Sequence, residues 1–238
     1  MTARPEAILS IPPLQGCLYC HHVGTVRYAE GRKVLGLGSG LPTATCSHCG
    51  TVAQLEIEDG DDPYWRIRYK KLNSAPEYYY VMVYLGEQRW IDGEEAMEIS
   101  RRGFVQRHRI DQVQHGDLEW LEPAPLNPPP PLMSPYETVY LAVPDVSLWQ
   151  PSSQNGGSGG SALDVGTFYV TDRRMHLVGQ QRDWSNRLAE IRSIEHDENA
   201  WRIFIGGNRQ YFTGSNTLES LDAQLFTAIV KALWKREE

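Results

Sequence analysis

All four cysteines of the 238-residue chain lie in two Cys-x-x-Cys pairs, Cys17–Cys20 and Cys46–Cys49. A spacing of two residues lets a tight turn aim both sulfurs at one point, and Gly50 directly after the second pair favours such a turn. Two turns brought together form a tetrahedral site, which suits Zn²⁺ at Zn–S distances of about 2.3 Å. Four thiolates leave no open position for water, so we predict one structural zinc ion per chain, held by Cys17, Cys20, Cys46 and Cys49.

Other uses of the cysteines stay open: an iron centre, a redox pair or disulfides. A thioredoxin-like pair lies at the mouth of a βαβ unit, whereas Cys17 follows a Pro-Pro dipeptide and precedes polar hairpin sequence. Disulfides need an oxidising compartment, and residues 1–13 lack the apolar core of a signal peptide. We therefore expect zinc and a cytoplasmic location. The neighbouring histidines are interpreted as surroundings of the site rather than ligands: His21, His22 and His48.

The overall charge argues against two classes of protein. The net charge is −7, and no segment of the chain is strongly basic. A high-affinity nucleic-acid binder needs a concentrated positive face, so this class is not favoured. No apolar run approaches the 18–20 residues or so of a membrane span, so we predict no transmembrane segment.

The cysteine pairs belong to a segment with β character. After a tail at residues 1–13, strand-like stretches occur at 24–30, 31–37 and 51–57, with a glycine-rich hairpin tip at 36–40. Two cysteine turns, each near a β-hairpin, resemble a zinc ribbon over residues 14–72. Domains of this size bury too little apolar surface to be stable alone, so the resemblance implies a metal-dependent fold.

The next segment, residues 73–122, is predicted to be a small β-β-α-β unit. Before it, Tyr64–Lys70 alternates apolar with basic residues, as an amphipathic strand does. Tyr78–Leu85 is rich in aromatic and β-branched residues and predicts a central strand. A helix is expected from Gly93 to Gly103, followed by a strand at Phe104–Arg107.

Composition marks a domain boundary at residues 123–135, which contain seven prolines. Such a segment favours a stiff polyproline-II-like linker. Strand character resumes at 136–150. The run of Ser, Gly, Asn and Gln at 152–161 predicts a mobile loop, and its GGSGGS sequence is also typical of an engineered linker.

The C-terminal part, residues 136–238, reads as antiparallel strands followed by one helix. Thr171–Arg174 has the side chains of a turn between two strands, and Gly206–Asn208 predicts another turn. Apolar residues at three- and four-residue steps predict a helix over 216–235, with Asn216 as its N-cap. The apolar face comprises Leu218, Leu221, Leu225, Ile229 and Leu233.

The segment Gly166–Gly179, with its Thr171-Asp-x-Arg174 sequence between two strands, and the later Ile191-x-x-Ile194 resemble the GRAM and bacterial pleckstrin-homology-like families over roughly residues 132–236. The resemblance implies an antiparallel barrel capped by one helix. The predicted fold class is therefore mainly β with α, α+β and multidomain. Families of this kind often bind lipid headgroups or peptides, which makes Arg173 and Arg174 candidate contacts.

No sequence motif supplies a nucleophile with its base, paired carboxylates or an open metal site, so we assign no catalytic residue and expect no enzymatic activity. The leading hypothesis is a zinc-binding adaptor or scaffold that contacts a protein partner. One alternative is nucleic-acid binding through the ribbon and the strand at 64–71, with Arg66 and Arg68 as contacts. The other is peripheral binding of anionic lipid by the pleckstrin-homology-like domain.

Overall fold

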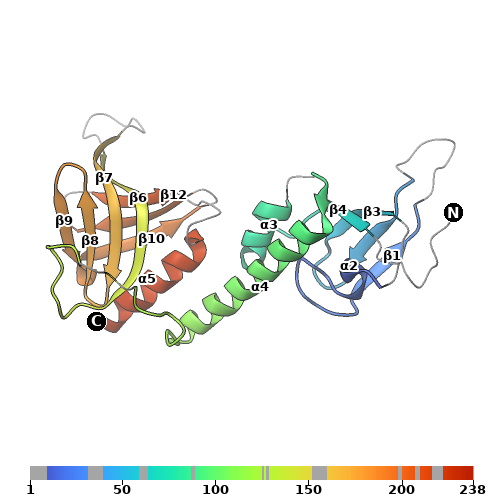
Figure 1. The fold of residues 1–238 in the computed structure, drawn as a ribbon, viewed down its shortest axis with the longest axis horizontal. Helices are drawn as coiled ribbons and strands as arrows, with labels where there is room; N and C mark the ends of the chain where they lie inside the picture. Colours follow the sequence, from blue (N-terminus) through green and yellow to red (C-terminus); the bar gives the residue numbers. More distant parts are fainter. Residues whose placement is uncertain are drawn as a thin grey trace. The chain divides into compact units, whose positions relative to one another are not determined.

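The computed structural model describes residues 10–31, 40–58, 64–86, 89–124, 126, 129–151, 160–197, 200–206, 210–215 and 222–237. The chain forms two compact units, Met1–His108 and Arg109–Glu238. Each unit is built on one antiparallel sheet accompanied by helices (Figure 1). The coarse prediction of a mainly β protein of the α+β class is confirmed. No described helix is long and apolar enough to cross a membrane.

The first unit contains a five-stranded sheet in the order β1-β2-β3-β4-β5. Its strands are β1 (Val26–Ala29), β2 (Thr43–Cys46), β3 (Val52–Glu58), β4 (Tyr64–Lys71) and β5 (Ile91–Asp92), preceded by the short helix α2 (Pro12–Gln15). The strands predicted near 24–30, 51–57 and 64–70 are therefore present. In β4 the side chains alternate between buried and outward-facing, as the sequence pattern predicts.

The predicted strand at 78–85 is wrong. The segment forms a 3-10 turn, Pro76–Tyr78, and the helix α3, Tyr79–Leu85. The buried side chains are Tyr78, Val81 and Leu85, whose spacing places them on one face of a helix. The β-branched and aromatic residues here reflect burial against neighbours, because strand preference depends strongly on packing context.

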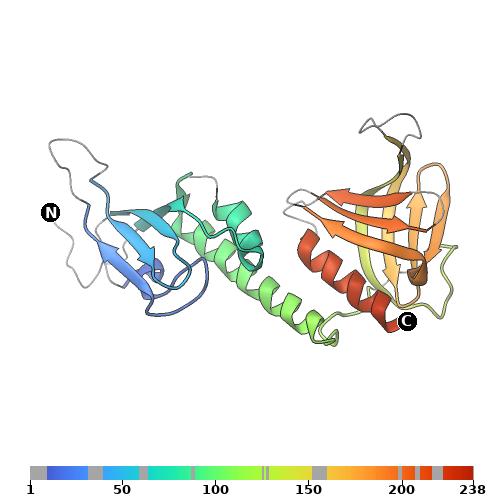
Figure 2. The same ribbon diagram turned by 180° about the vertical axis from the view of Figure 1, so that it is seen from behind.

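The helix α4 extends from Gly93 to Gln114, so the predicted end at Gly103 and the predicted strand at 104–107 are both wrong. The β-β-α-β arrangement is therefore absent from the described part of residues 73–122, which contains helices α3 and α4 and the short strand β5 (Figure 2). Gly103 has a packing role, because a Cβ at this position would collide with Cγ2 of Val81 in α3. A glycine that signals a helix end in the sequence thus permits two helices to pack closely.

Replacing Gly103 with alanine is expected to destabilise the first unit by about 1–3 kcal/mol, the usual cost of overpacking a core. Helix propensity alone predicts the opposite sign, a gain of up to about 1 kcal/mol. Chemical denaturation of Gly103→Ala measures which effect is larger. The added change Val81→Ala removes the colliding methyl group, so the double variant should lose less stability than the sum of the two single changes. A more stable Gly103→Ala single variant would contradict this packing role.

The core of the first unit joins residues from the whole segment between Ile11 and Ile99. Its fully buried side chains come from the first cysteine turn (Tyr19), from β3 and β4 (Leu55, Ile67) and from α3 and β5 (Leu85, Ile91). The cysteine turns therefore pack against the segments on both sides of residue 72. The division into domains at residue 72 stays a prediction.

The second unit contains a seven-stranded antiparallel sheet in the order β10-β11-β12-β6-β7-β8-β9. Its strands are β6 (Val139–Pro151), β7 (Gly160–Thr171), β8 (Arg174–Gly179), β9 (Asp183–Arg187), β10 (Ile191–His196), β11 (Ala200–Ile205) and β12 (Tyr211–Ser215). The predicted turn at 171–174 joins β7 to β8. Because β9 and β10 are unpaired edges among the described strands, the sheet is open rather than a closed barrel.

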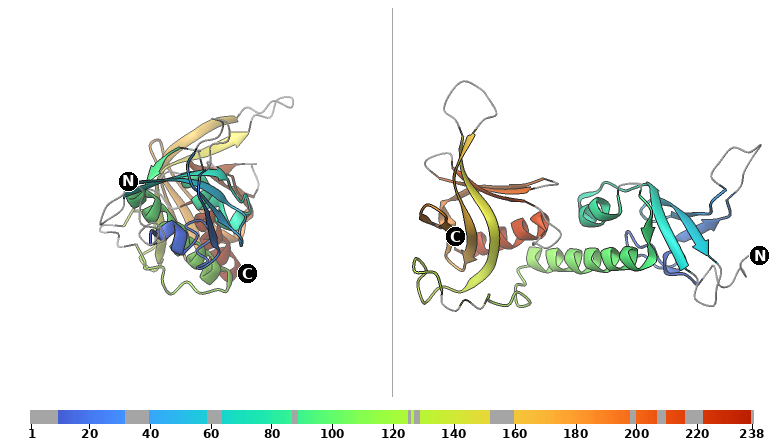
Figure 3. Two further views of the ribbon diagram at one scale, coloured as in Figure 1. Left: turned by 90° about the vertical axis from the view of Figure 1, so that its right-hand side faces the viewer. Right: turned by 45° about the horizontal axis from the view of Figure 1, so that its top comes forward.

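Strand β6 connects the two halves of this sheet. Its pairing with β7 shifts register between Val143 and Val146, and Asp145 has a φ of 57°. Such a bulge bends a strand and increases its twist. Beyond the bend, Ser147–Trp149 pairs with β12 on the other side. The curvature of β6 (yellow) is visible in Figure 3.

The helix α5 (Ala223–Glu237) follows the strands and packs its apolar side into the core. The indole of Trp201 stacks on the ring of Phe226 with 3.9 Å between centroids. Asp222 caps the helix, because its Oδ1 accepts hydrogen bonds from the backbone N–H groups of Gln224 and Leu225 at 2.8 and 3.2 Å. The predicted N-cap Asn216 lies outside the described residues.

Several other predictions fall wholly or mainly on residues outside the described ranges. They are the greater part of the tail at 1–13, the strand at 31–37 with the glycine tip at 36–40, the Gly/Ser loop at 152–161 and the turn at 206–208. Of the predicted loop, Gly160 and Ser161 are described and belong to β7.

Candidate metal centre

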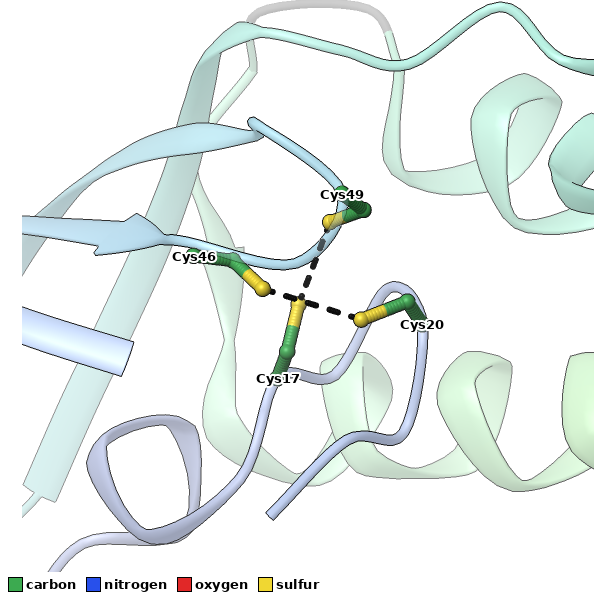
Figure 4. Close-up of side chains that lie close together, drawn as sticks. All are labelled: Cys17, Cys20, Cys46 and Cys49. Carbon is green, nitrogen blue, oxygen red and sulfur yellow. Dashed lines mark hydrogen bonds between the residues drawn. The ribbon is translucent and has the colours of Figure 1, made fainter. Parts of the chain in front are cut away.

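The four cysteine sulfurs converge on one point between two turns (Figure 4). All four Sγ atoms lie within 4.8 Å of one another. The sulfur of Cys17 is 3.7 Å from that of Cys49, and the sulfur of Cys20 is 3.7 Å from that of Cys46. The cysteines are buried and unbridged. This arrangement is compatible with a bound metal ion.

The two cysteine turns share one backbone design. In the first, the N–H of His21 donates to the carbonyl of Cys17 at 2.8 Å, and in the second the N–H of Gly50 donates to that of Cys46 at 3.0 Å. Both donor residues have a positive φ, 63° for His21 and 74° for Gly50. The turn closes because the residue after each pair adopts the left-handed conformation, which glycine reaches at little cost and histidine at some cost.

Replacing Gly50 with alanine is expected to lower the unfolding free energy of the first unit by about 1–2 kcal/mol, because φ stays positive while a Cβ is added. Nothing lies within 4 Å of the added Cβ, so the effect is one of backbone conformation alone. Gly16→Ala is the matched control, since Gly16 is extended (φ −152°) and its added Cβ makes only ordinary contacts at 3.8 Å. Urea denaturation compares them, and equal losses would contradict the role of φ.

Hydroxyl groups and burial set the acidity of the thiols. Burial raises the pKa of Cys17 to about 11 and also raises that of Cys20. Burial opposes ionisation of Cys46 as well, but the Thr25 hydroxyl 3.3 Å from its sulfur and the N–H groups of its own turn bring its pKa to about 6. Thr51 lies 3.1 Å from the Cys49 sulfur. A divalent cation at the centre would stabilise all four thiolates directly.

The neighbouring histidines do not join the sulfur cluster. His22 and His48, one from each turn, are exposed and stack on each other with 3.4 Å between ring centroids. His21 packs against Phe104 of α4 at 5.1 Å. Burial, together with the charge of Arg107, lowers the pKa of His21 to about 4. None of the three rings belongs to the sulfur cluster, and their role as surroundings of the site stays a prediction.

Hydrogen bonds attach both cysteine turns to the rest of the first unit. Ser100 of α4 donates from its hydroxyl to the carbonyl of Leu18 at 2.8 Å. The side-chain amide of Asn73 donates to the carbonyl of Cys49 at 3.0 Å. The backbone carbonyl of Asn73 accepts a hydrogen bond from the Tyr19 hydroxyl at 2.6 Å. These contacts were not predictable from the sequence, because each joins residues more than twenty positions apart.

The candidate contacts Arg66 and Arg68 lie side by side on the outward face of β4. Arg66 pairs with Glu56 at 3.4 Å, and Arg68 donates to Gln54 at 2.7 Å while its guanidinium lies 4.7 Å from the ring centroid of Trp90. The aromatic residues Trp65 and Tyr69 of this strand are buried. Stacking on nucleic-acid bases needs exposed rings, and of the aromatic side chains of β4 only Tyr64 is exposed. Both cations of this face already have partners.

The candidate contacts Arg173 and Arg174 lie at the turn between β7 and β8 and also have acidic neighbours. Arg173 is 3.5 Å from Asp172, and Arg174 is 3.8 Å from Glu137. The hydroxyl of Thr171 accepts the N–H groups of both arginines at 3.1 and 2.8 Å. The Thr-Asp-x-Arg sequence therefore serves to hold this turn.

Sequence reasoning missed a buried pair beside the same turn. The Nε2 of His176 lies 2.8 Å from Oε2 of Glu137, and both side chains are almost completely buried. The hydroxyl of Thr171 also lies 3.0 Å from this carboxylate oxygen. Thirty-nine residues separate His176 from Glu137, so only the folded chain brings them together.

Comparisons with known proteins add no function. No family model matches the chain, and no curated protein matches it significantly. A solved structure that matches, the C-terminal domain of an unknown protein from Leishmania infantum, is 19% identical over 41% of this chain and 84% of that chain, with a TM-score of 0.28. A likeness this weak carries no argument.

Proposed function

We propose that the protein is a non-enzymatic adaptor whose first unit is held in shape by one zinc ion and presents a groove to a protein partner. The zinc proposal is supported by the sulfur spacing. A regular tetrahedron with sulfurs about 2.3 Å from its centre has edges of about 3.8 Å. The Cys17–Cys49 and Cys20–Cys46 sulfur distances are both 3.7 Å. Four sulfurs complete the shell, which favours a structural role.

The adaptor proposal is carried by the distribution of exposed apolar side chains. Five large apolar residues are conspicuously exposed among the described residues, and four of them belong to the first unit: Val23 (81%), Tyr64 (51%), Met97 (40%) and Phe104 (53%). Val23, Met97 and Phe104 line a groove of about 370 Å³. Tyr64 and Met97 line a second groove of about 610 Å³, and Pro12 and Met97 belong to both grooves. Contiguous apolar surface of this kind is typical of a protein-binding site.

The zinc site forms one wall of the smaller groove. The first cysteine turn contributes Cys17, Leu18 and Val23, and α4 contributes Met97 and Phe104 from the opposite side. The groove therefore keeps its shape only while the turn is held, which connects a structural metal to binding.

The charge at the groove rim indicates the kind of partner. Arg101 at the rim and the adjacent Arg102 share a single carboxylate, that of Glu98, at 2.9 and 2.6 Å. Two cations with one anion leave a net positive charge beside the smaller groove, whereas the larger groove is lined by the carboxylates of Asp92 and Glu94. We expect a peptide segment that inserts apolar side chains and carries an acidic residue near them.

A photo-crosslinking residue tests this surface in cells that express the full chain. Placed at Phe104, it should give a discrete protein adduct that disappears with Met97→Glu. Placed at Tyr136, which is 84% exposed in the second unit, it should not give that adduct. No adduct at position 104, or the same adduct from both positions, would contradict the adaptor proposal.

The finer fold assignments are proposals too. Two cysteine turns beside a small antiparallel sheet support a zinc-ribbon-like first unit. Seven antiparallel strands with a C-terminal helix packed on the core support a second unit that is an open variant of the pleckstrin-homology-like fold. Reduced, unbridged cysteines are consistent with the proposed cytoplasmic location.

A further inference from the structure

The second unit contains a pocket that none of the functions above uses. It has a volume of about 430 Å³ and lies between the last turns of α4 and the helix α5. This volume is within the usual range for small-molecule sites. Its α4 wall includes Ile110 and Val113, which belong to the core of the second unit.

The lining contains an apolar floor, a cationic rim and the polar side chains of Gln114, His196, Gln224 and Thr227. The floor is formed by Ile110, Val113, Ala228 and Ala232. The rim carries Lys231, Lys235 and Arg236, all from α5. Lys231 and Lys235 are one helical turn apart and therefore project from the same side of the helix.

The rim cations have few partners among the described residues. No ion pair there joins Lys231 or Lys235 to a carboxylate. Arg236 donates to the backbone carbonyl of Gly116 at 3.0 Å, which fixes it at the edge of the pocket without neutralising it.

The two carboxylates that act on the nearby His196 already have other partners. Asp197 pairs with Arg202 at 3.0 Å, and Asp222 caps α5. His196 lies at the pocket wall. Burial and the ammonium of Lys231 lower the pKa of His196, whereas Asp222 and Asp197 raise it, and the net effect is a lowered pKa. The pocket is thus a place where an anion would gain favourable interactions.

We propose that this pocket binds a small amphiphilic organic anion, with its apolar body on the floor and its anionic head between Lys231, Lys235 and Arg236. A medium-chain monocarboxylate has this chemistry. The described lining contains no Phe, Tyr or Trp side chain, and its one aromatic ring is the imidazole of His196; the apolar contacts it offers are mostly aliphatic, which favours an aliphatic ligand. The competing explanation is that these cations only stabilise the C-terminal end of α5 through the helix dipole.

Titration of the full chain with octanoate, followed by NMR and calorimetry, separates the two explanations. Saturable binding should perturb the His196 ring resonances, and the double variant Lys231→Gln, Lys235→Gln should bind about tenfold more weakly, a change of 1.4 kcal/mol. The control Lys70→Gln, Lys71→Gln makes the same charge change in β4 and should bind like the parent chain. 1-Octanol and acetate, which lack the head or the body, should both bind more weakly than octanoate.

Three results of the octanoate titration would overturn the proposal. Absence of saturable octanoate binding, or an equal loss in the β4 control variant, would overturn it. So would acetate binding as tightly as octanoate. Binding to vesicles of anionic phospholipid is measured as well. If the chain binds the vesicles through Lys231 and Lys235 but does not bind free octanoate, the cations contact a membrane surface and the pocket proposal is wrong.

Discussion

Replacing Cys17 or Cys46 with serine is expected to unfold the first unit and leave the second folded. Structural zinc contributes about 10–16 kcal/mol of apparent free energy in small zinc-dependent folds, more than the total stability of most domains. Each replacement removes one of four buried sulfurs and leaves an incomplete shell. The two units have separate cores, so the loss should stay within the first.

Limited proteolysis with mass spectrometry measures this outcome. The serine variants should lose residues 10–108 quickly while a fragment close to 109–238 persists. His48→Ser is the matched control, because His48 lies in the second cysteine turn but is exposed and outside the sulfur cluster. Serine variants that keep both protease resistance and metal would show that the cysteines do not hold the fold.

The second large effect is expected in the other unit. Replacing Glu137 with alanine should destabilise it by about 2–4 kcal/mol, because the change leaves a buried, charge-assisted hydrogen-bonding group without its partner. The ring of His176 is fully buried, and its Nδ1 already lacks a partner among the described residues. Glu137 also lies just before β6 and fastens the start of that strand to the turn at Thr171.

A double-mutant cycle with His176→Leu isolates the interaction. If the pair is coupled as its 2.8 Å contact implies, the double variant should lose clearly less stability than the sum of the single losses. Thermal unfolding of the second unit provides the measurement. Strict additivity would mean that Glu137 acts through some other contact.

The Glu137–His176 pair makes the stability of the second unit sensitive to acid. Burial alone would raise the pKa of Glu137, but hydrogen bonds from His176 and Thr171 hold it below its usual value near 4.5. A lowered folded-state pKa contributes stability that is complete above the unfolded value and is lost as pH falls through the folded one. Stability should therefore fall below about pH 4.5, and Glu137→Gln should flatten this acid limb.

The clustering of the four cysteines was the most predictable part of the molecule, because two-residue spacing within each pair and a glycine after the second encode the turn locally. Strands whose residues alternate, such as β4, were predictable for the same reason. The errors arose where packing outweighs local preference. The segment 78–85 has strand-like composition yet forms mainly a helix. Gly103 suggests a helix end in the sequence, yet it lies inside α4 and leaves room for the side chain of Val81.

Features that depend on contacts between residues far apart in the chain could not be predicted from the sequence. Glu137 and His176 meet across thirty-nine positions, and the exposed residues Val23, Met97 and Phe104 form a groove only when the first cysteine turn packs on α4. An exposed apolar residue is unremarkable by itself in a sequence, and its neighbours in space decide whether it belongs to a binding surface.

Elemental mass spectrometry of the purified full chain tests the central claim most directly. The account predicts one zinc ion per chain, reduced to near zero in the Cys17→Ser and Cys46→Ser variants and retained in His48→Ser. A chain that folds without any metal, or that contains iron in place of zinc, would contradict the zinc-stabilised first unit and return the two cysteine pairs to redox chemistry.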